Sequence, residues 1–393
     1  MESIPELNQN RPRSCWLEVN LDALRHNLNQ VQQQLSSDSS LLAVVKAEAY
    51  GHGAEMVSET LANEGVDFLG VATLEEGIKL RDFGIDTKIL IMGHMATFNV
   101  DALLDYDFTP FVFSYRLLHA LNEAGKNRGR GVPIHLKVDT GMGRLGILPD
   151  DADEFLEEIQ SLDYINLEGV ASHFAQAGEN KAYTDSQIEQ FKSLKETVLD
   201  MGFSPDHWHC MNSAAIFSRS NDVGNTVRPG ITLYGYQPNE SLPSRDLQPI
   251  MQVKTKMADY KQVPAGRGVS YGRRFKPEEP TWVGVLPLGY ADGYAREFSQ
   301  KAHVLKDGRK CPVLGSVCMD MTMIQLSEKD DPEQTVTVMG TDGELSVWAD
   351  QLARWNSTIT YEILCSFSER LPRIYRENGE SIALKTERTV KRL

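Results

Sequence analysis

The N-terminal part of the chain alternates short apolar runs with segments of helical periodicity, and this alternation restricts the possible folds more than any other feature. Helix-like segments such as Asp150–Leu162 and Asp185–Met201 separate most of the runs. The eight runs are Leu41–Lys46, Asp67–Ala72, Lys88–Met92, Thr109–Phe113, Pro133–Asp139, Asn166–His173, His207–Met211 and Asn225–Arg228. Eight strand–helix repeats match a TIM-type barrel in number and length. We therefore predict an α/β fold with a (β/α)8 barrel over residues 15–245.

The pattern changes after this barrel-like segment. From about Gln248 onward helical segments become rare, and short β-rich runs such as Met251–Val263 and Thr335–Met339 follow one another. Turn sequences such as Lys306-Asp307-Gly308 separate these runs. The polar, proline-containing stretch Pro238–Pro249 is the expected connector. We predict a mostly β C-terminal domain over residues 246–393.

Charge and composition argue against several classes of protein. The formal net charge is −15, whereas a general nucleic-acid-binding protein needs a basic face to neutralise phosphates. No apolar run is long enough to span a bilayer, and residues 1–14 are too polar for a secretory signal. The five cysteines are scattered without metal-ligand spacing. We expect a cytoplasmic protein that binds no nucleic acid, no membrane and no metal.

Polar residues stand at the ends of several predicted strands. Lys46 closes the first run, Asp139 the fifth, His173 the sixth and Arg228 the eighth, while Asn212 and Ser213 follow the seventh. The carboxyl ends of barrel strands all face one end of the barrel, where active sites form. The sequence therefore predicts that these side chains converge on one mouth.

The segment Ala43–Gly53, AVVKAEAYGHG, contains the most informative of these residues. A lysine at the end of a buried apolar strand is costly to keep charged, so its pKa is expected to fall and its amine to become nucleophilic. Such an amine is suited to forming a Schiff base with an aldehyde cofactor. For Lys46 alone, a side chain that merely reaches from the strand end to solvent would explain the pattern equally well.

The segment AVVKAEAYGHG resembles the cofactor-lysine motif of alanine racemases, and further motifs of that family follow in order. They are HLKVDTGMGRLG at 135–146, SHFA at 172–175, NSA at 212–214, VRPGITLYG at 227–235, VSYG at 269–272, GYADGY at 289–294, VCMD at 317–320 and YEI at 361–363. The resemblance extends from about Cys15 to Tyr375. It implies a fold of a barrel followed by a β domain, with pyridoxal 5'-phosphate as the cofactor.

The resemblance implies a role for each matching residue in cofactor binding. Lys46 would hold pyridoxal phosphate covalently, and Arg228 would face the pyridine nitrogen. Since arginine has no acceptor and keeps its proton, it would leave that nitrogen unprotonated and the substrate carbanion short-lived. Hydroxyls and backbone N–H groups suit a phosphate, and the matching phosphate contacts are Tyr50, Ser213, Gly230, Ile231 and Tyr361.

The resemblance also implies two catalytic bases, Lys46 and Tyr271, on opposite faces of the substrate. A chain from Tyr271 through His173 to Arg228 would tune the tyrosine, whose ordinary pKa is near 10. In the family this tyrosine comes from the partner subunit, so a homodimer with shared active sites is expected.

Three further residues match positions that handle charge near the substrate. Arg144 matches the residue near the cofactor phenolic oxygen and the substrate carboxylate. Lys137 matches a lysine that is carbamylated in many members and pairs with that arginine. Met319 matches the backbone position that binds the substrate carboxylate, although its side chain alone would be read as core packing.

The expected activity is the interconversion of L- and D-alanine, supplying D-alanine for cell-wall peptidoglycan. The main alternative is a serine or broad-specificity amino-acid racemase of the same fold. A decarboxylase with a related barrel and β domain should carry a cysteine-based acid and a glycine-rich phosphate loop, and the Tyr271 and Arg228 segments stand in their place. A non-catalytic cofactor-binding protein would lack the C-terminal β domain.

The chain departs from the family pattern at two positions near the expected site. Glu48 stands where alanine racemases usually have asparagine, and Gly178 stands where an entryway aspartate is usual. Arg296 keeps the arginine that such an aspartate would face. These departures leave substrate selectivity and gating open.

Overall fold

The computed structural model describes residues 13–218, 223–239, 241–329, 331–386 and 389–392. The chain forms two compact units, and each is described by itself. The barrel unit contains Arg25–Ala49 and Ala54–Gln248. The β unit contains the described residues up to Leu24, the short segment Tyr50–Gly53, and the described residues from Pro249 onward.

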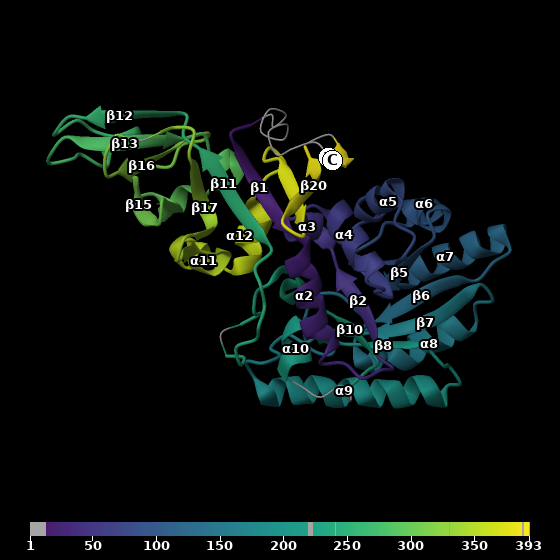
Figure 1. The fold of residues 1–393 in the computed structure, drawn as a ribbon. Helices are drawn as coiled ribbons and strands as arrows, with labels where there is room; N and C mark the ends of the chain where they lie inside the picture. Colours follow the sequence, from purple (N-terminus) through teal and green to yellow (C-terminus); the bar gives the residue numbers. More distant parts are fainter. Residues whose placement is uncertain (1–12, 219–222, 240, 330, 387–388, 393) are drawn as a thin grey trace. The chain divides into compact units, whose positions relative to one another are not determined.

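The barrel unit is built on parallel strands in the order β8-β7-β6-β5-β4-β3-β2-β10-β9 (Figure 1). Every neighbouring pair in this order is parallel. The strands are β2 (Ser40–Val44), β3 (Phe68–Val71), β4 (Lys88–Ile91), β5 (Phe108–Val112), β6 (Val132–Lys137), β7 (Ile165–Ala171), β8 (His207–His209), β9 (Met211–Asn212) and β10 (Thr226–Arg228). The predicted barrel is confirmed.

One predicted strand, His207–Met211, is divided in two. β8 pairs with β7 and β9 pairs with β10, so the segment passes from one neighbour to the other around Cys210. The two short strands together occupy one position in the barrel wall. Because β10 also pairs with β2, the sheet returns to its first strand and nearly closes.

Helices connect the barrel strands, and their ends follow local sequence signals. Thr73 caps α5 (Leu74–Phe83) in a reciprocal capping box with Glu76, and Gly84 ends it at φ 99°. Ser114 caps α7 (Tyr115–Arg128). The others are α2 (Leu21–Gln32), which also supplies the last residues of the β unit's first segment, α4 (Ala54–Asn63), α6 (Val100–Asp105), α8 (Ala152–Gln160), α9 (Lys181–Asp200) and α10 (Ser213–Ser218). Within the described part, no helix combines the length and apolarity needed to cross a membrane.

The β unit is built on one extended sheet in the order β12-β13-β16-β15-β14-β17-β11-β1-β19-β20-β21, with β18 paired to β17 (Figure 1). Its strands are β1 (Cys15–Asn20), β11 (Met251–Lys256), β12 (Asp259–Val263), β13 (Thr281–Leu286), β14 (His303–Lys306), β15 (Arg309–Leu314), β16 (Thr322–Leu326), β17 (Thr335–Asp342), β18 (Leu345–Val347), β19 (Arg373–Glu377), β20 (Glu380–Lys385) and β21 (Val390–Arg392). Two helices, α11 (Ala349–Asn356) and α12 (Thr360–Ser366), complete it. The mostly β character is as predicted.

The first strand of the chain lies in the β unit. β1 pairs antiparallel with β11 and parallel with β19, although it belongs to the segment from which we expected the barrel to begin. The burial of Trp16 against Ile374 and Leu384 anchors this pairing. The N-terminal strand and the C-terminal domain therefore fold as one body.

Candidate active site

The polar residues singled out in the barrel lie at the carboxyl ends of its strands. Arg228 is the last residue of β10, and Asp139 and His173 each lie two residues beyond a strand, β6 and β7 respectively. Asn212 is the last residue of β9, and Ser213 directly follows it. Lys46 follows β2 after one residue. Because all these strands are parallel, the residues lie at the same end of the barrel, as predicted.

The backbone after Lys46 forms a left-handed helical turn. Ala47, Glu48, Ala49 and Tyr50 have φ values of 53°, 56°, 51° and 54°. The N–H of Ala49 donates to the carbonyl of Val45 at 2.9 Å. For L-residues this conformation costs roughly 1–2 kcal/mol per residue, and single residues rather than runs are usual. Such strain at a functional site requires other contacts that hold it.

Arg228 is buried, and four groups lie within hydrogen-bond distance of its two terminal nitrogens. Its NH1 donates to the carbonyl of His209 at 2.5 Å, and its NH2 donates to the carbonyl of Ser172 at 2.5 Å. The ring Nδ1 atoms of His209 and His173 lie 2.8 Å and 3.2 Å from the guanidinium. Burial lowers the pKa of Arg228 to about 10, which still leaves it charged at neutral pH. The guanidinium is therefore a fixed cation at the barrel mouth.

The histidines around Arg228 are held neutral. Burial, and then the Arg228 charge, lower the pKa of His173 and of His209 well below the ordinary value. The His173–Arg228 contact was expected from the family resemblance. His209 was missed, and so was His135, whose Nδ1 lies 2.8 Å from Nε2 of His209. Both histidines lie in predicted strands, Pro133–Asp139 and His207–Met211, and this position could have marked them as members of the site.

A charged surface pair stands behind these histidines. Glu168 of β7 has one oxygen 3.5 Å from Nε2 of His135, and Lys88 of β4 donates to the other oxygen at 2.7 Å. The nearby His135 ring and the Lys88 ammonium outweigh partial burial and lower the pKa of Glu168 to about 2. A carboxylate thus stands on the far side of His135 from the Arg228 cation.

Lys137 is a buried amine beside positive charge. Burial, followed by the proximity of Arg228, lowers its pKa to about 7, and its Nζ donates to the carbonyl of Val138 at 2.9 Å. The adjacent Asp139 shapes the loop that carries Arg144. The Asp139 carboxylate accepts the N–H groups of Gly141, Met142 and Arg144 at 2.9, 2.6 and 2.8 Å. A substantial fraction of Lys137 is therefore neutral and nucleophilic near neutral pH.

Hydroxyl and amide groups meet at the start of α10. The Ser213 Oγ accepts the N–H of Gly230 at 2.9 Å and lies 3.2 Å from the Thr232 Oγ1. Ile231 begins the 3-10 turn Ile231–Tyr234 that follows Gly230. All four residues are buried. This donor set, with hydroxyls and backbone N–H groups in place of cationic side chains, is the kind that binds a phosphate group.

The β unit brings together the two tyrosines that match the family's phosphate contacts. The rings of Tyr50 and Tyr361 have centroids 6.0 Å apart at an interplanar angle of 47°. Burial raises the pKa of Tyr361 to about 12 and raises that of Tyr50 as well. Both phenols therefore keep their protons near neutral pH and can donate hydrogen bonds. Lys46 and Ser213 belong to the other unit.

Tyr271 and Met319 lie on adjoining loops of the β unit, and both are exposed, at 74% and 54%. The Ser316 Oγ donates to the carbonyl of Tyr271 at 3.2 Å, and the Ala291 N–H donates to the carbonyl of Met319 at 3.0 Å. The neighbouring Ser270, at φ 62°, donates its hydroxyl to the Ser316 carbonyl at 2.6 Å. These bonds set the backbone that presents the two side chains.

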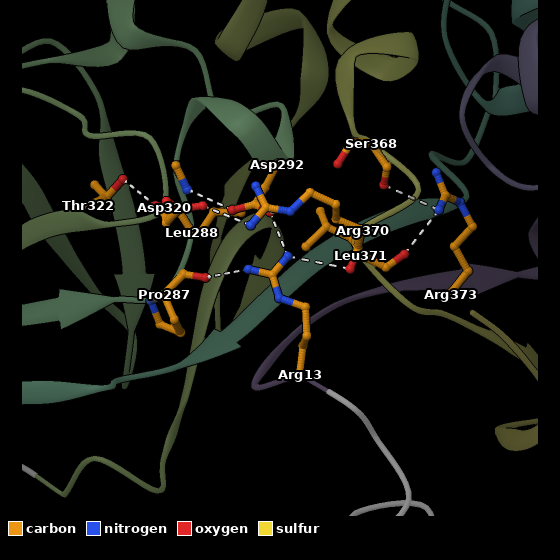
Figure 2. Close-up of polar contacts among 11 residues, drawn as sticks. Arg13, Pro287, Leu288, Asp292, Asp320, Thr322, Ser368, Arg370, Leu371 and Arg373 are labelled. Carbon is orange, nitrogen blue, oxygen red and sulfur yellow. Dashed lines mark hydrogen bonds and ion pairs between the residues drawn. The ribbon is translucent and has the colours of Figure 1, made fainter. Parts of the chain in front are cut away.

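The buried carboxylate of Asp292 lies between Arg13 and Arg370 (Figure 2). Arg13 donates to Asp292 Oδ1 at 2.6 Å, and Arg370 Nε lies 3.5 Å from the same oxygen. Arg370 also donates to Asp320 at 2.8 Å, next to Met319. The other Asp292 oxygen accepts the Gly289 N–H at 3.1 Å. Two arginines and two aspartates thus tie the 289–294 loop to the Met319 loop.

The two departures from the family pattern have defined surroundings. The Glu48 carboxylate forms an ion pair with Lys79 of α5, so it adds no isolated negative charge beside Lys46. Gly178 has φ 81°, and a Cβ built there would lie 2.9 Å from Leu242 Cδ2. A side chain at this position is strained and crowded, which explains why glycine fits it.

The residues at the barrel mouth fit pyridoxal phosphate. The Lys46 amine, just before the left-handed turn, suits the aldehyde of the cofactor. The hydroxyls and backbone N–H groups around Ser213 suit its phosphate. The fixed Arg228 cation suits its ring nitrogen. The fit rests on the chemistry of these amine, hydroxyl, amide and guanidinium groups. This fit agrees with the cofactor that the resemblance to alanine racemases implies.

Comparisons with known proteins show what the chain is similar to. Residues 19–238 match the family described as alanine racemase, N-terminal domain, and residues 250–375 match alanine racemase, C-terminal domain. The alanine racemase of Clostridium novyi is 37% identical over 380 residues, covering 95% of this chain and 98% of that protein. The alanine racemase of Geobacter sulfurreducens is 39% identical over 371 residues, covering 92% and 97%.

Solved structures show the same likeness. The alanine racemase of Clostridium difficile 630 has a TM-score of 0.91 at 36% identity, covering 96% of this chain and all of that one. The alanine racemase of Bacillus anthracis with bound L-Ala-P has a TM-score of 0.89 at 33% identity, covering 95% and 98%. Both the barrel and the β unit fall within these matches.

Proposed function

Because the chain belongs to the alanine racemase family, and is thus an amino-acid racemase, we propose that it interconverts L- and D-alanine by a two-base proton transfer with pyridoxal phosphate as cofactor. The observation that carries this proposal is the buried Arg228, fixed at the barrel mouth by the carbonyls of His209 and Ser172. When bound, pyridoxal phosphate withdraws electrons from the substrate α-carbon and acidifies its proton.

The chain's own residues divide the work of moving that proton. Lys46 Nζ takes or gives the proton on one face of the α-carbon, and Tyr271 Oη does so on the other. Arg144 and the Met319 N–H hold the substrate carboxylate. The Ser213 hydroxyl and the N–H groups of Gly230 and Ile231 bind the phosphate, together with the phenols of Tyr50 and Tyr361.

Arg228 selects the outcome of the reaction. A guanidinium donates hydrogen bonds but keeps its protons, so it does not transfer a proton to the ring nitrogen. Arg228 would therefore leave the ring nitrogen of bound pyridoxal phosphate unprotonated, and the cofactor would withdraw fewer electrons from the α-carbon. Rapid return of a proton to the same carbon favours racemisation over transamination.

We propose that Tyr271 acts in the active site of a partner subunit, in a homodimer with shared sites. At 74% exposure, Tyr271 is largely open to solvent in the single chain. Met319 and Tyr290, bonded to the same loop system, are also exposed, at 54% and 43%. Several large exposed side chains on loops that are bonded to one another are typical of a surface that another chain covers.

Lys137 is proposed to carry a carbamate. With its pKa near 7, part of the amine is neutral at physiological pH and able to add carbon dioxide. The modified side chain would be an anion beside Arg228 and Arg144, so that a repulsive contact becomes attractive. A cytoplasmic location and the supply of D-alanine for peptidoglycan complete the proposal.

The proposed function is tested on purified protein. Borohydride reduction followed by peptide mapping should place the cofactor on Lys46. Exchange of the α-proton with solvent deuterium should be fastest for alanine in a panel that also contains serine, lysine and glutamate. Absence of the cofactor, or reduction onto a different lysine, would refute the assignment, whereas a preference for serine would change only the substrate.

A further inference from the structure

Side chains of one helix of the barrel unit, α5, contact the left-handed turn that follows Lys46. The Glu76 Oε1 of α5 accepts the N–H of Ala47 at 2.7 Å, and its Oε2 accepts the N–H of Ala72 at 2.7 Å. One carboxylate thus joins the turn to the end of the neighbouring strand β3. The same carboxylate closes the capping box of α5, so its position is set by the start of that helix.

The second contact comes from the next turn of the same helix. Lys79 donates to the Glu48 carboxylate and lies 3.5 Å from that of Glu55. Glu76 and Lys79 are three residues apart and therefore project from one face of α5. The other Glu48 oxygen accepts the N–H of Ala54 at 3.4 Å, the first residue of α4. The turn is held at its start by Glu76 and at its middle by Lys79.

The identity of residue 48 makes the second contact important. Asparagine, the residue usual in the family, is among the few that adopt the left-handed conformation readily. Glutamate lacks that advantage, and it also places a charge close to the carboxylate of Glu55. Lys79 lies within ion-pair distance of both carboxylates, so removing it would leave two partly buried anions close together.

We propose that Glu76 and Lys79 are positioning residues of this enzyme, and that the Glu48–Lys79 ion pair replaces the usual asparagine in holding the turn that aims Lys46. The inference rests on the proposed role of Lys46 as the cofactor-binding base. A carboxylate in the turn brings the geometry of the catalytic amine under the control of an ion pair on α5. Because the Lys79 side chain is 37% exposed, the pair is screened only in part by salt.

The test compares Lys79→Met, Glu48→Asn and the double variant as holoenzymes. Lys79→Met removes the ammonium that lies within ion-pair distance of both Glu48 and Glu55, and misplacement of the amine should lower kcat roughly 10- to 100-fold. Glu48→Asn should stay within about threefold of the native enzyme, and in the double variant it should restore most of the lost kcat. The Michaelis constant should change little, because none of these residues contacts the substrate.

A second readout does not depend on activity. Hydrogen–deuterium exchange of the amides of residues 47–50 should rise in Lys79→Met and return to the native rate in the double variant. Lys181→Met is the matched control, since Lys181 forms an exposed ion pair with Asp185 on α9. It should change neither kcat nor exchange at the turn. Raised salt should increase exchange at the turn in the native chain but not in Glu48→Asn.

The outcomes separate this inference from the proposed function. Equal losses of kcat in Lys79→Met and in the double variant, with unchanged exchange at residues 47–50, would overturn the positioning role. A native enzyme in which borohydride labels a lysine other than Lys46 would instead refute the proposed function, and the exchange data would still report on the turn. If Lys79→Met alone does not fold, a folded double variant with native exchange supports the ion pair and an unfolded one opposes it.

Discussion

The guanidinium of Arg228 and His209 are joined at two points: NH1 donates to the His209 carbonyl at 2.5 Å and lies 2.8 Å from the ring Nδ1. Since arginine only donates, Nδ1 accepts, and the single proton of this neutral ring is on Nε2. That nitrogen faces His135 Nδ1 at 2.8 Å, which leaves the His135 proton on Nε2, toward Glu168 at 3.5 Å. Arg228 is thus held by acceptors, and the N–H donors of Arg228, His209 and His135 all point away from the guanidinium.

Substitution of Arg228 by glutamate should alter the reaction itself. A carboxyl group can hydrogen-bond to a protonated ring nitrogen, as arginine cannot, so the carbanion should live longer. We expect racemisation to slow by roughly 10²–10³, a long-wavelength absorption band to appear with alanine, and transamination products to form. Arg228→Gln, which removes the guanidinium but supplies no carboxyl group, is the control and should show neither. An Arg228→Glu enzyme with the native rate and spectrum would refute the proposed role.

Mixing two inactive variants should restore activity if the active site is shared. Lys46→Ala chains lack one base and Tyr271→Phe chains lack the other. In a mixed dimer one site regains both bases and the other loses both. Random exchange in an equal mixture should therefore recover about a quarter of native activity in a twofold-symmetric dimer. Subunit exchange, followed by mass spectrometry, with no return of activity would contradict the shared site.

The low pKa of Lys137 should appear in the pH dependence of stability. The folded protein loses this proton near pH 7, whereas the unfolded chain keeps it up to about 10.5. Between these values the unfolded state binds more protons, so the free energy of unfolding contributed by Lys137 rises with pH. Below pH 7 the lysine is protonated in both states and its destabilising effect is complete. The whole shift corresponds to at most about 5 kcal/mol.

The predicted pH dependence of stability can be measured by thermal unfolding of the native chain and of Lys137→Met, in buffers free of carbon dioxide. The variant should be more stable below pH 7, and the difference should narrow toward pH 10. A difference that does not change with pH would mean that the lysine is protonated in both states throughout. Adding bicarbonate should stabilise only the native chain if the carbamate forms.

Serine should be turned over, but more slowly than alanine. If Tyr271, Tyr361 and Met319 act as the family resemblance implies, they would frame a methyl-sized pocket. A pocket that lacks a partner for an added hydroxyl rejects it only modestly, by roughly 10–200-fold in kcat/KM. Steady-state constants for both substrates test this, and a higher value for serine would overturn the substrate assignment while leaving the racemase mechanism in place.

Gly178→Asp should affect stability as well as substrate entry. At φ 81°, with Leu242 Cδ2 only 2.9 Å from a new Cβ, any side chain should cost about 1–3 kcal/mol of folding free energy. Gly178→Ala shares this cost without the carboxylate. We expect both variants to melt lower than the native protein, and only the aspartate to raise the Michaelis constant for alanine. Equal constants in the two variants would exclude a role for charge at this position in substrate entry.

The sequence by itself determined the barrel and the placing of its polar residues. Alternating apolar and helical periods are local properties, and in a parallel barrel a residue at a strand's carboxyl end has only one end of the barrel to face. Lys46, Asp139, His173 and Arg228 could therefore be assigned to one mouth before any coordinates. The family motifs supplied their expected roles.

Only the tertiary structure decided which distant segments pair. β1 has the apolar pattern of a barrel strand, yet it joins the β unit. Its partners β11 and β19 lie more than two hundred residues away in the sequence, so local periodicity could not identify them. In the same way, Glu48 reads as a solitary departure until Lys79 is placed beside it. Pairing across the chain depends on which surfaces fit together in three dimensions, and local periodicity carries no record of that.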